Sequence, residues 1–193
     1  MTTANKITIV RILLIPVFIA EVLYYFKTGN ETHRFAALLA FTVAAVLDGV
    51  DGYVARRYNQ RSELGAILDP LADKLLLVSG VILLSLPGRH FISVIPSWLT
   101  VTILSRDVLL VLGIIVVHYT CGKSNVRPRI SGKIATVFQM ITVVWTLLKW
   151  NERWLSGWVI AAGVFTAYSG VFYLFDWMRQ MNASPASSPT PKQ

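Results

Sequence analysis

The sequence has 193 residues, a formal net charge of +8 and a hydrophobic content of 54%. This apolar share exceeds the roughly 45–50% that is usual in soluble domains, so the composition argues against a water-soluble fold. The length suits a single domain. The Lys and Arg residues cluster around the ends of apolar stretches, so we interpret them as topology signals and predict no nucleic-acid partner.

Long apolar stretches follow one another along the chain, and most approach the ~20 residues that cross a bilayer. Lipid-facing backbone must be hydrogen-bonded within its own segment, and no barrel-like alternation is present, so helices are predicted. The expected fold is all-α, a polytopic bundle of six transmembrane helices in residues 1–181, with a disordered Ser/Pro-rich tail in residues 182–193. The predicted spans are about Ile7–Phe26, Phe35–Ala55, Ala66–Leu86, Pro96–Tyr119, Ile134–Leu148 and Trp154–Trp177.

The distribution of basic residues predicts the orientation of this bundle. More Lys and Arg lie at the termini and in the second and fourth loops than in the other loops. This distribution favours a cytoplasmic position for the termini and for the second and fourth loops. We therefore expect a multi-pass protein of the cell's inner (cytoplasmic) membrane with both termini in the cytoplasm.

Acidic residues are concentrated where the second predicted span ends and the third begins. The chain has ten Asp and Glu residues, and this region holds Asp48, Asp51, Asp69 and Asp73. Each would cost about 2.5–3.5 kcal/mol deep in a membrane, so a positive partner is required. On helices, the spacings of three and four residues place each pair on one face. Hard carboxylate oxygens suit Mg²⁺ or Mn²⁺, and we predict two ions.

Two other interpretations of these acids stay open. They could be helix caps or solvated acids at the membrane surface, although caps do not explain the ordered spacing. They could also line the pathway of a divalent-cation transporter, although a pathway predicts acids spread through the membrane depth rather than gathered at one face.

The acidic region resembles the signature of the CDP-alcohol phosphatidyltransferases, whose members move a phosphatidyl group from a CDP-activated lipid to an alcohol. The matching string is Asp48-x-x-Asp51-Gly52-x-x-Ala55-Arg56, eight further residues, then Gly65-x-x-x-Asp69-x-x-x-Asp73. The resemblance implies that Asp48, Asp51 and Asp69 hold the metal ions, while Asp73 completes the cluster and is the catalytic base. It also implies a homodimer, an active site on the cytoplasmic side, and a CDP-binding site made by Asn5, Thr8, Gly52, Ala55, Arg56 and Gly65.

A second group of basic residues suggests where the acceptor alcohol binds. Arg106 and Lys133 lie inside or at the ends of the fourth and fifth predicted spans, and Arg129 lies in the adjoining loop. Cations in a membrane need partners, and an acceptor that carries its own phosphate would supply one. For Arg106 and Arg129, contact with lipid headgroups is the alternative.

Among the family's activities, the length, start and signature resemble those of bacterial phosphatidylglycerophosphate synthases. That resemblance implies CDP-diacylglycerol and sn-glycerol 3-phosphate as substrates, with membrane lipids as surroundings. Two features are instead similar to cardiolipin synthases, whose acceptor is phosphatidylglycerol. They are the segment around Arg106 and the residue Ala135, which stands where phosphatidylglycerophosphate synthases often have a second lysine. An inositol phosphate or another acceptor is the third alternative.

Overall fold

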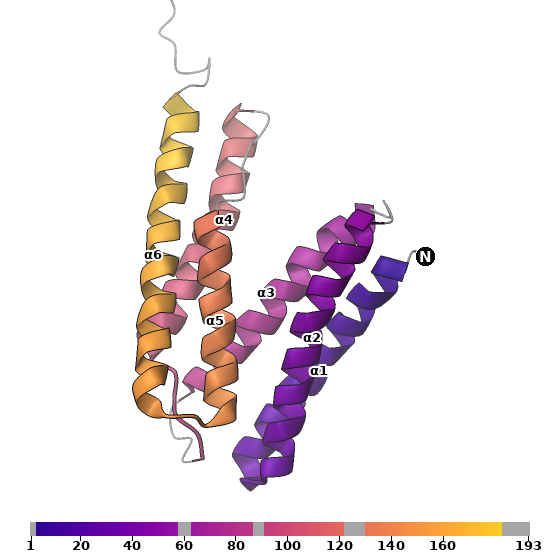
Figure 1. Cartoon of the computed structure of the whole chain (residues 1–193). Coiled ribbons are helices and arrows are strands. Elements are labelled where there is room, and N and C mark those ends of the chain that lie inside the picture. Colours follow the sequence, from indigo (N-terminus) through magenta and orange to yellow (C-terminus); the bar gives the residue numbers. More distant parts are fainter. Residues whose placement is uncertain (1–2, 58–62, 87–90, 122–129, 183–193) are drawn as a thin grey trace, which may run out of the picture.

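The protein is all-α in the computed structural model, which describes residues 3–57, 63–86, 91–121 and 130–182 (Figure 1). Within these ranges, the side chains of residues 3–6, 51–57, 63–67, 69, 114, 117–121, 130 and 179–182 fall outside the description. The predicted fold class is therefore confirmed at the level of all-α. The helices are α1 (Thr3–Thr28), α2 (Glu31–Arg57), α3 (Glu63–Ser85), α4 (Ser97–Cys121), α5 (Ile130–Leu148) and α6 (Glu152–Asn182).

Four helices of the described part are long and apolar enough to cross a membrane. The candidate spans lie in α1, α2, α5 and α6 and comprise Ile7–Thr28, Glu31–Val50, Ser131–Leu148 and Glu152–Met178. Large apolar side chains stand on their outer faces, for example Leu13 on α1, Leu39 on α2 and Val164 on α6. Such exposure suits a lipid environment, so the chain is membrane-embedded, whereas the spanning of α3 and α4 stays a prediction.

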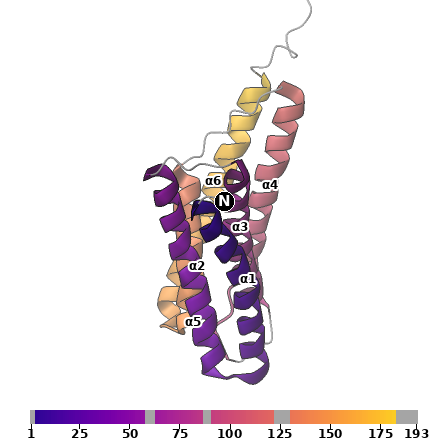
Figure 2. The same cartoon turned by 90° about the vertical axis from the view of Figure 1, so that its right-hand side faces the viewer.

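The helices run alternately up and down (Figures 1 and 2). Helix α1 packs along α2, and α6 packs along α4 and α5. Helix α3 lies against α1 and crosses diagonally to reach α4 and α5, so it joins the two groups (Figure 1). The starts of α1, α3 and α5 lie toward the same end as the ends of α2, α4 and α6. The acidic region and the basic region of the sequence are thereby brought to one end of the bundle.

Two short turns at the opposite end fix neighbouring helices in antiparallel pairs. Helix α1 ends at Thr28 and is followed by Gly29, whose φ of 68° is readily adopted by a residue without a side chain. The Asn30 side chain then caps α2 by accepting a hydrogen bond from the Thr32 amide at 3.0 Å. Asn151 caps α6 in the same way, accepting from the Arg153 amide at 3.0 Å.

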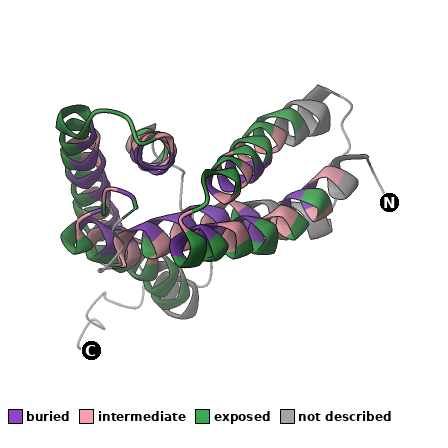
Figure 3. Ribbon diagram, turned by 90° about the horizontal axis from the view of Figure 1, so that it is seen from below, coloured by how far each residue is buried: buried purple, intermediate pink, exposed green. Residues whose placement is uncertain are grey.

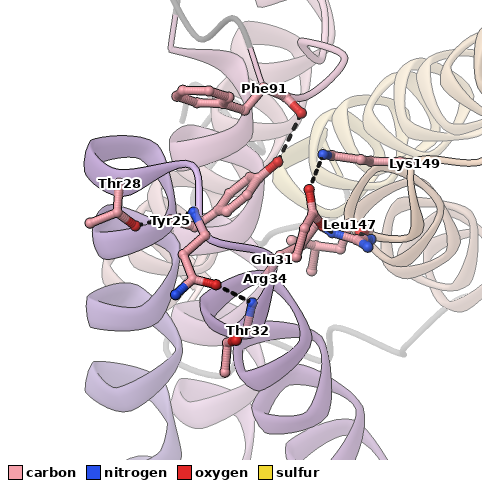
Figure 4. Close-up of polar contacts among 9 residues, drawn as sticks. Tyr25, Thr28, Glu31, Thr32, Arg34, Phe91, Leu147 and Lys149 are labelled. Carbon is pink, nitrogen blue, oxygen red and sulfur yellow. Dashed lines mark hydrogen bonds and ion pairs between the residues drawn. The ribbon is translucent and has the colours of Figure 1, made fainter.

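A polar cluster ties these turns together (Figure 4). Glu31 at the start of α2 forms ion pairs with Arg34 and with Lys149, which follows α5. Arg34 also donates to the main-chain carbonyl of Leu147. These polar contacts join α2 to the end of α5, at the end of the bundle that lies away from the acidic region.

The buried core runs along the helices between these two ends (Figure 3). Phe18 of α1 packs against Phe41 of α2 with ring centroids 5.4 Å apart. Leu76 of α3, Ile103 of α4 and Val143 of α5 belong to the same cluster. Because every helix contributes to the core or packs on it, the polar groups at the acidic end have fixed positions relative to one another.

Candidate active site

Two of the predicted acids meet on a buried arginine from a third helix. Arg11 of α1 is 1% exposed, and its Nη1 lies 2.9 Å from Oδ1 of Asp48 on α2. Its Nη2 donates to Oδ1 of Asp73 on α3. A buried guanidinium is tolerated only when it is paired, and here it compensates two carboxylates at once. The positive partner that the acids require is thus supplied in part by the chain itself.

The other two predicted metal ligands lie on the same helices. Asp51 is one turn after Asp48 on α2, and Asp69 is one turn before Asp73 on α3, but both side chains fall outside the described residues. Among the side chains that the structure describes, no group of three or more His, Cys, Asp or Glu forms a metal cluster. The structure therefore brings Asp48 and Asp73 together, and the proposed ligand roles of all four stay predictions.

Of the residues expected to bind CDP, only Thr8 has a described side chain. Thr8 is 1% exposed and lies one turn before Arg11 on α1, and Arg11 is the residue that contacts the acidic pair. The remaining predicted CDP ligands have side chains outside the described residues: Asn5 on α1, Gly52, Ala55 and Arg56 on α2, and Gly65 on α3.

Arg106 of α4 is held in place by groups from three helices. It is 7% exposed, and its Nη1 donates to Oδ1 of the neighbouring Asp107 at 2.8 Å. Its Nη2 donates to the Ser169 hydroxyl of α6 at 3.3 Å, and its guanidinium lies 5.7 Å from the ring centre of Tyr173. On α5, a Cβ placed at Gly132 would lie 2.8 Å from Arg106 Nη2. The guanidinium therefore has one defined orientation.

Asp107 links this arginine to the helix that carries the acidic pair. It forms an ion pair with Lys74 of α3, the residue directly after Asp73. Arg106 Nε and Asp107 Oδ2 are buried and have no hydrogen-bond partner among the described residues. Buried polar atoms are normally paired, so these two atoms are among the exceptions in the described part of the chain.

A cavity of about 480 Å³ lies between the acidic and the basic groups. Asp73 and Lys74 line it from α3, Arg106 from α4 and Lys133 from α5. The remaining lining residues are Pro70, Leu77, Leu110, Gly132, Thr136, Gln139 and Tyr173. The structure thus places the predicted base and two predicted acceptor ligands around one space, while Arg129 lies outside the described residues.

Several residues of this site did not stand out as site residues in the sequence. Arg11, Lys74, Asp107 and Gln139 each place a charge or an amide within an otherwise apolar stretch. A polar residue inside a membrane helix is costly and is a signal for a functional position. That signal was present for all four, but it does not reveal which residues on other helices they contact.

The chemistry of the cavity suits an anionic ligand that carries a hydroxyl group. Arg106, Lys133 and Lys74 present donors that bind phosphate or carboxylate oxygens. Asp73 lines the same cavity from α3 and can accept a proton from a hydroxyl group. A ligand that contacts both would have its hydroxyl oxygen close to the acidic pair.

Comparison with known proteins agrees with this chemistry. A curated protein of Mycobacterium tuberculosis (strain ATCC 25618 / H37Rv) named "Probable phosphatidylglycerophosphate synthase" is 35% identical over 141 residues, which are 72% of this chain and 63% of the relative. One of Escherichia coli (strain K12) named "CDP-diacylglycerol--glycerol-3-phosphate 3-phosphatidyltransferase" is 33% identical over 184 residues, 93% of each chain. The chain thus spans less than two thirds of the mycobacterial relative's length.

The family assignment rests on most of the chain. The sequence model that describes the CDP-alcohol phosphatidyltransferases matches residues 1–169, which include the acidic pair, Arg11 and every residue that lines the cavity except Tyr173. The predicted family resemblance is confirmed. This chain belongs to the CDP-alcohol phosphatidyltransferase family.

Proposed function

We propose that the protein transfers the phosphatidyl group of CDP-diacylglycerol to sn-glycerol 3-phosphate, releasing CMP and forming phosphatidylglycerophosphate. The observation that carries this proposal is the single cavity shared by Asp73, Arg106 and Lys133. An acceptor with both a phosphate and a hydroxyl group fits the two walls of this cavity. The name of the Escherichia coli relative contains this acceptor, and the name of the mycobacterial relative contains this product.

The reaction is a single displacement at phosphorus. The acceptor hydroxyl oxygen attacks the phosphorus that bears the diacylglycerol, the bond from that phosphorus to the oxygen of CMP breaks, and the hydroxyl proton passes to Asp73. Arg106 and Lys133 would hold the phosphate of the acceptor, which fixes its hydroxyl group near Asp73. Lys74 lines the same cavity and would add a third positive charge.

The acidic residues fit the divalent metal ions that the family resemblance implies. Asp48 and Asp73 converge from two helices on one cationic group, the guanidinium of Arg11, so their carboxylates are already arranged around positive charge. Asp51 and Asp69, one turn away on the same helices, would complete the ligand set for Mg²⁺ or Mn²⁺, with two ions expected. When bound, such ions neutralise the diphosphate and the charge of the departing CMP.

The donor would approach from the membrane on the same end of the bundle. Thr8 is buried beside Arg11, and Asn5, Gly52, Ala55, Arg56 and Gly65 lie on the three helices that form the acidic region. We assign the cytidine and diphosphate of CDP-diacylglycerol to this group, so the donor and the acceptor phosphates occupy opposite sides of Asp73.

We also propose six membrane spans, with α3 and α4 crossing the bilayer beside the four apolar helices. An even number of crossings puts both termini and the active site on one side. The basic residues of the second and fourth loops favour the cytoplasmic side of the inner membrane. A homodimer, which the family resemblance implies, is part of the proposal and is checked by the mass of the purified protein in detergent.

The acceptor assignment is tested with the purified protein, CDP-diacylglycerol and Mg²⁺. We expect CMP release when sn-glycerol 3-phosphate is added and little release with phosphatidylglycerol. Release with phosphatidylglycerol alone would favour cardiolipin synthesis. If liposomes containing the protein transported Mg²⁺ and consumed no CDP-diacylglycerol with any acceptor, the protein would be a transporter.

A further inference from the structure

Arg11 is a charged residue in the interior of the bundle that the reaction described above does not use. It is among the largest fully buried side chains and belongs to the apolar helix α1. Among its partners, Asp48 and Asp73 have side chains that are 36% and 34% exposed. The guanidinium is therefore buried against the acidic pair, while both carboxylates stay partly exposed.

The contacts of Arg11 fall on the same groups that would hold a metal ion. Two carboxylates on neighbouring helices repel each other when nothing positive lies between them, and the repulsion is strong where the surroundings are apolar. Arg11 removes this repulsion by binding one oxygen of each. A divalent ion on the same carboxylates would stand beside the guanidinium and be repelled by it. Arg11 and the metal ion thus compete for one pair of ligands.

We propose that Arg11 is a positioning residue that holds Asp48 and Asp73 together while the site is free of metal, and that metal binding weakens these contacts. The inference rests on the metal site of the proposed function and adds an internal cation that stabilises the metal-free protein. Its consequence is that α1, α2 and α3 stay packed at their acidic ends before the ions bind.

The test compares two substitutions at Arg11 with one at a second buried arginine. Arg11→Met keeps much of the side-chain length and removes the charge, and Arg11→Lys keeps the charge. Arg34→Met is the matched control, because Arg34 is 8% exposed and pairs with Glu31 at the opposite end of the bundle. Two quantities are measured for each protein in detergent: Mn²⁺ affinity from the electron paramagnetic resonance of free Mn²⁺, and thermal unfolding midpoints in EDTA and in saturating Mg²⁺.

We expect Arg11→Met to bind Mn²⁺ about tenfold more tightly than the wild type, because one repelling charge is gone. Its midpoint in EDTA should fall, and its rise on adding Mg²⁺ should exceed that of the wild type. Arg11→Lys should bind Mn²⁺ within about threefold of the wild type. Arg34→Met should lower the midpoints in EDTA and in Mg²⁺ equally and leave Mn²⁺ affinity unchanged.

Unchanged or weaker Mn²⁺ binding by Arg11→Met would overturn the proposal. Failure of this variant to fold in Mg²⁺ as well as in EDTA would overturn it too, because the ions should replace the missing charge. Folding only in Mg²⁺ would support it. If the wild type binds no Mn²⁺, the proposed metal site itself fails. Lack of CMP release with glycerol 3-phosphate, by contrast, would refute the acceptor assignment and leave the Mn²⁺ comparison intact.

Discussion

Lys74 of α3 forms an ion pair with Asp107 of α4, and Asp107 also accepts a hydrogen bond from Arg106 at 2.8 Å. One carboxylate therefore holds two cations of the cavity, and the first of them directly follows Asp73. The Asp107 side chain thus connects the segment that carries the proposed base, Asp73, to Arg106 of the proposed phosphate site.

Asp107→Asn should disturb acceptor binding and spare donor binding. The amide lacks the charge that holds Lys74 and Arg106, so we expect the KM for glycerol 3-phosphate to rise about tenfold while the KM for CDP-diacylglycerol stays within about twofold. Steady-state CMP release at varied concentrations of each substrate measures both. Glu152→Gln is the control, because Glu152 is exposed and binds Ser93 near the other end of the bundle. An equal rise in both KM values would contradict the assignment.

Gly132→Ala should act through Arg106. An added Cβ would lie 2.8 Å from Arg106 Nη2 and 3.1 Å from the Tyr173 hydroxyl, so the guanidinium must move. We expect a loss of acceptor affinity of about tenfold, with donor affinity preserved. Gly157→Ala on α6 is the matched control, because a Cβ there meets nothing within 4 Å and alanine favours a helix. Wild-type kinetics for Gly132→Ala would show that the position of Arg106 does not set acceptor binding.

Asp48→Asn should lose most of its activity, about a hundredfold or more, because an amide oxygen binds a divalent ion more weakly than a carboxylate and leaves charge uncompensated. The same loss is expected for Asp51→Asn and Asp69→Asn. Turnover at limiting and at saturating Mg²⁺ measures it, with Glu21→Gln as a control acid far along α1. Near wild-type turnover of a variant at limiting Mg²⁺ would remove that residue from the ligand set.

Removal of metal should abolish the activity of the wild type. We expect no CMP release in excess EDTA and recovery when Mg²⁺ or Mn²⁺ is restored, because the diphosphate charge then has no counter-ion. The thermal unfolding midpoint, followed in the same samples, separates loss of chemistry from loss of fold. Full activity in excess EDTA would exclude a metal-dependent reaction.

The all-α class and the approximate limits of the apolar helices could be predicted from the sequence, because hydrophobicity and length act locally. The predicted span Ile7–Phe26, for example, lies within α1 (Thr3–Thr28). The acids Asp48 and Asp73 were also predicted to be neighbours, since their spacing and family signature are contained in one segment of the chain.

The partners of these acids could not be predicted in the same way. Arg11 is separated from Asp73 by 62 residues, and their contact depends on how α3 packs against α1. The pairing of Lys74 with Asp107 depends likewise on the crossing of α3 toward α4. A residue type and its depth in a span indicate that a partner is needed, whereas helix packing decides which residue it is.

The division of the site into a donor side and an acceptor side is tested by comparing three further variants. Arg106→Ala and Lys133→Ala should each raise the KM for glycerol 3-phosphate roughly ten- to a hundredfold, as expected for one lost charge-assisted contact. Arg56→Ala should instead raise the KM for CDP-diacylglycerol. Equal weakening of donor binding in all three variants would refute separate donor and acceptor sides.

The most direct measurement follows radiolabelled sn-glycerol 3-phosphate into lipid in the presence of CDP-diacylglycerol and Mg²⁺. Purified wild-type protein should incorporate the label into phosphatidylglycerophosphate and release CMP in equal amount, and Lys133→Ala should do so only at higher acceptor concentration. CMP release without incorporation of the label into lipid would contradict glycerol 3-phosphate as the acceptor. So would formation of an unlabelled lipid product from phosphatidylglycerol.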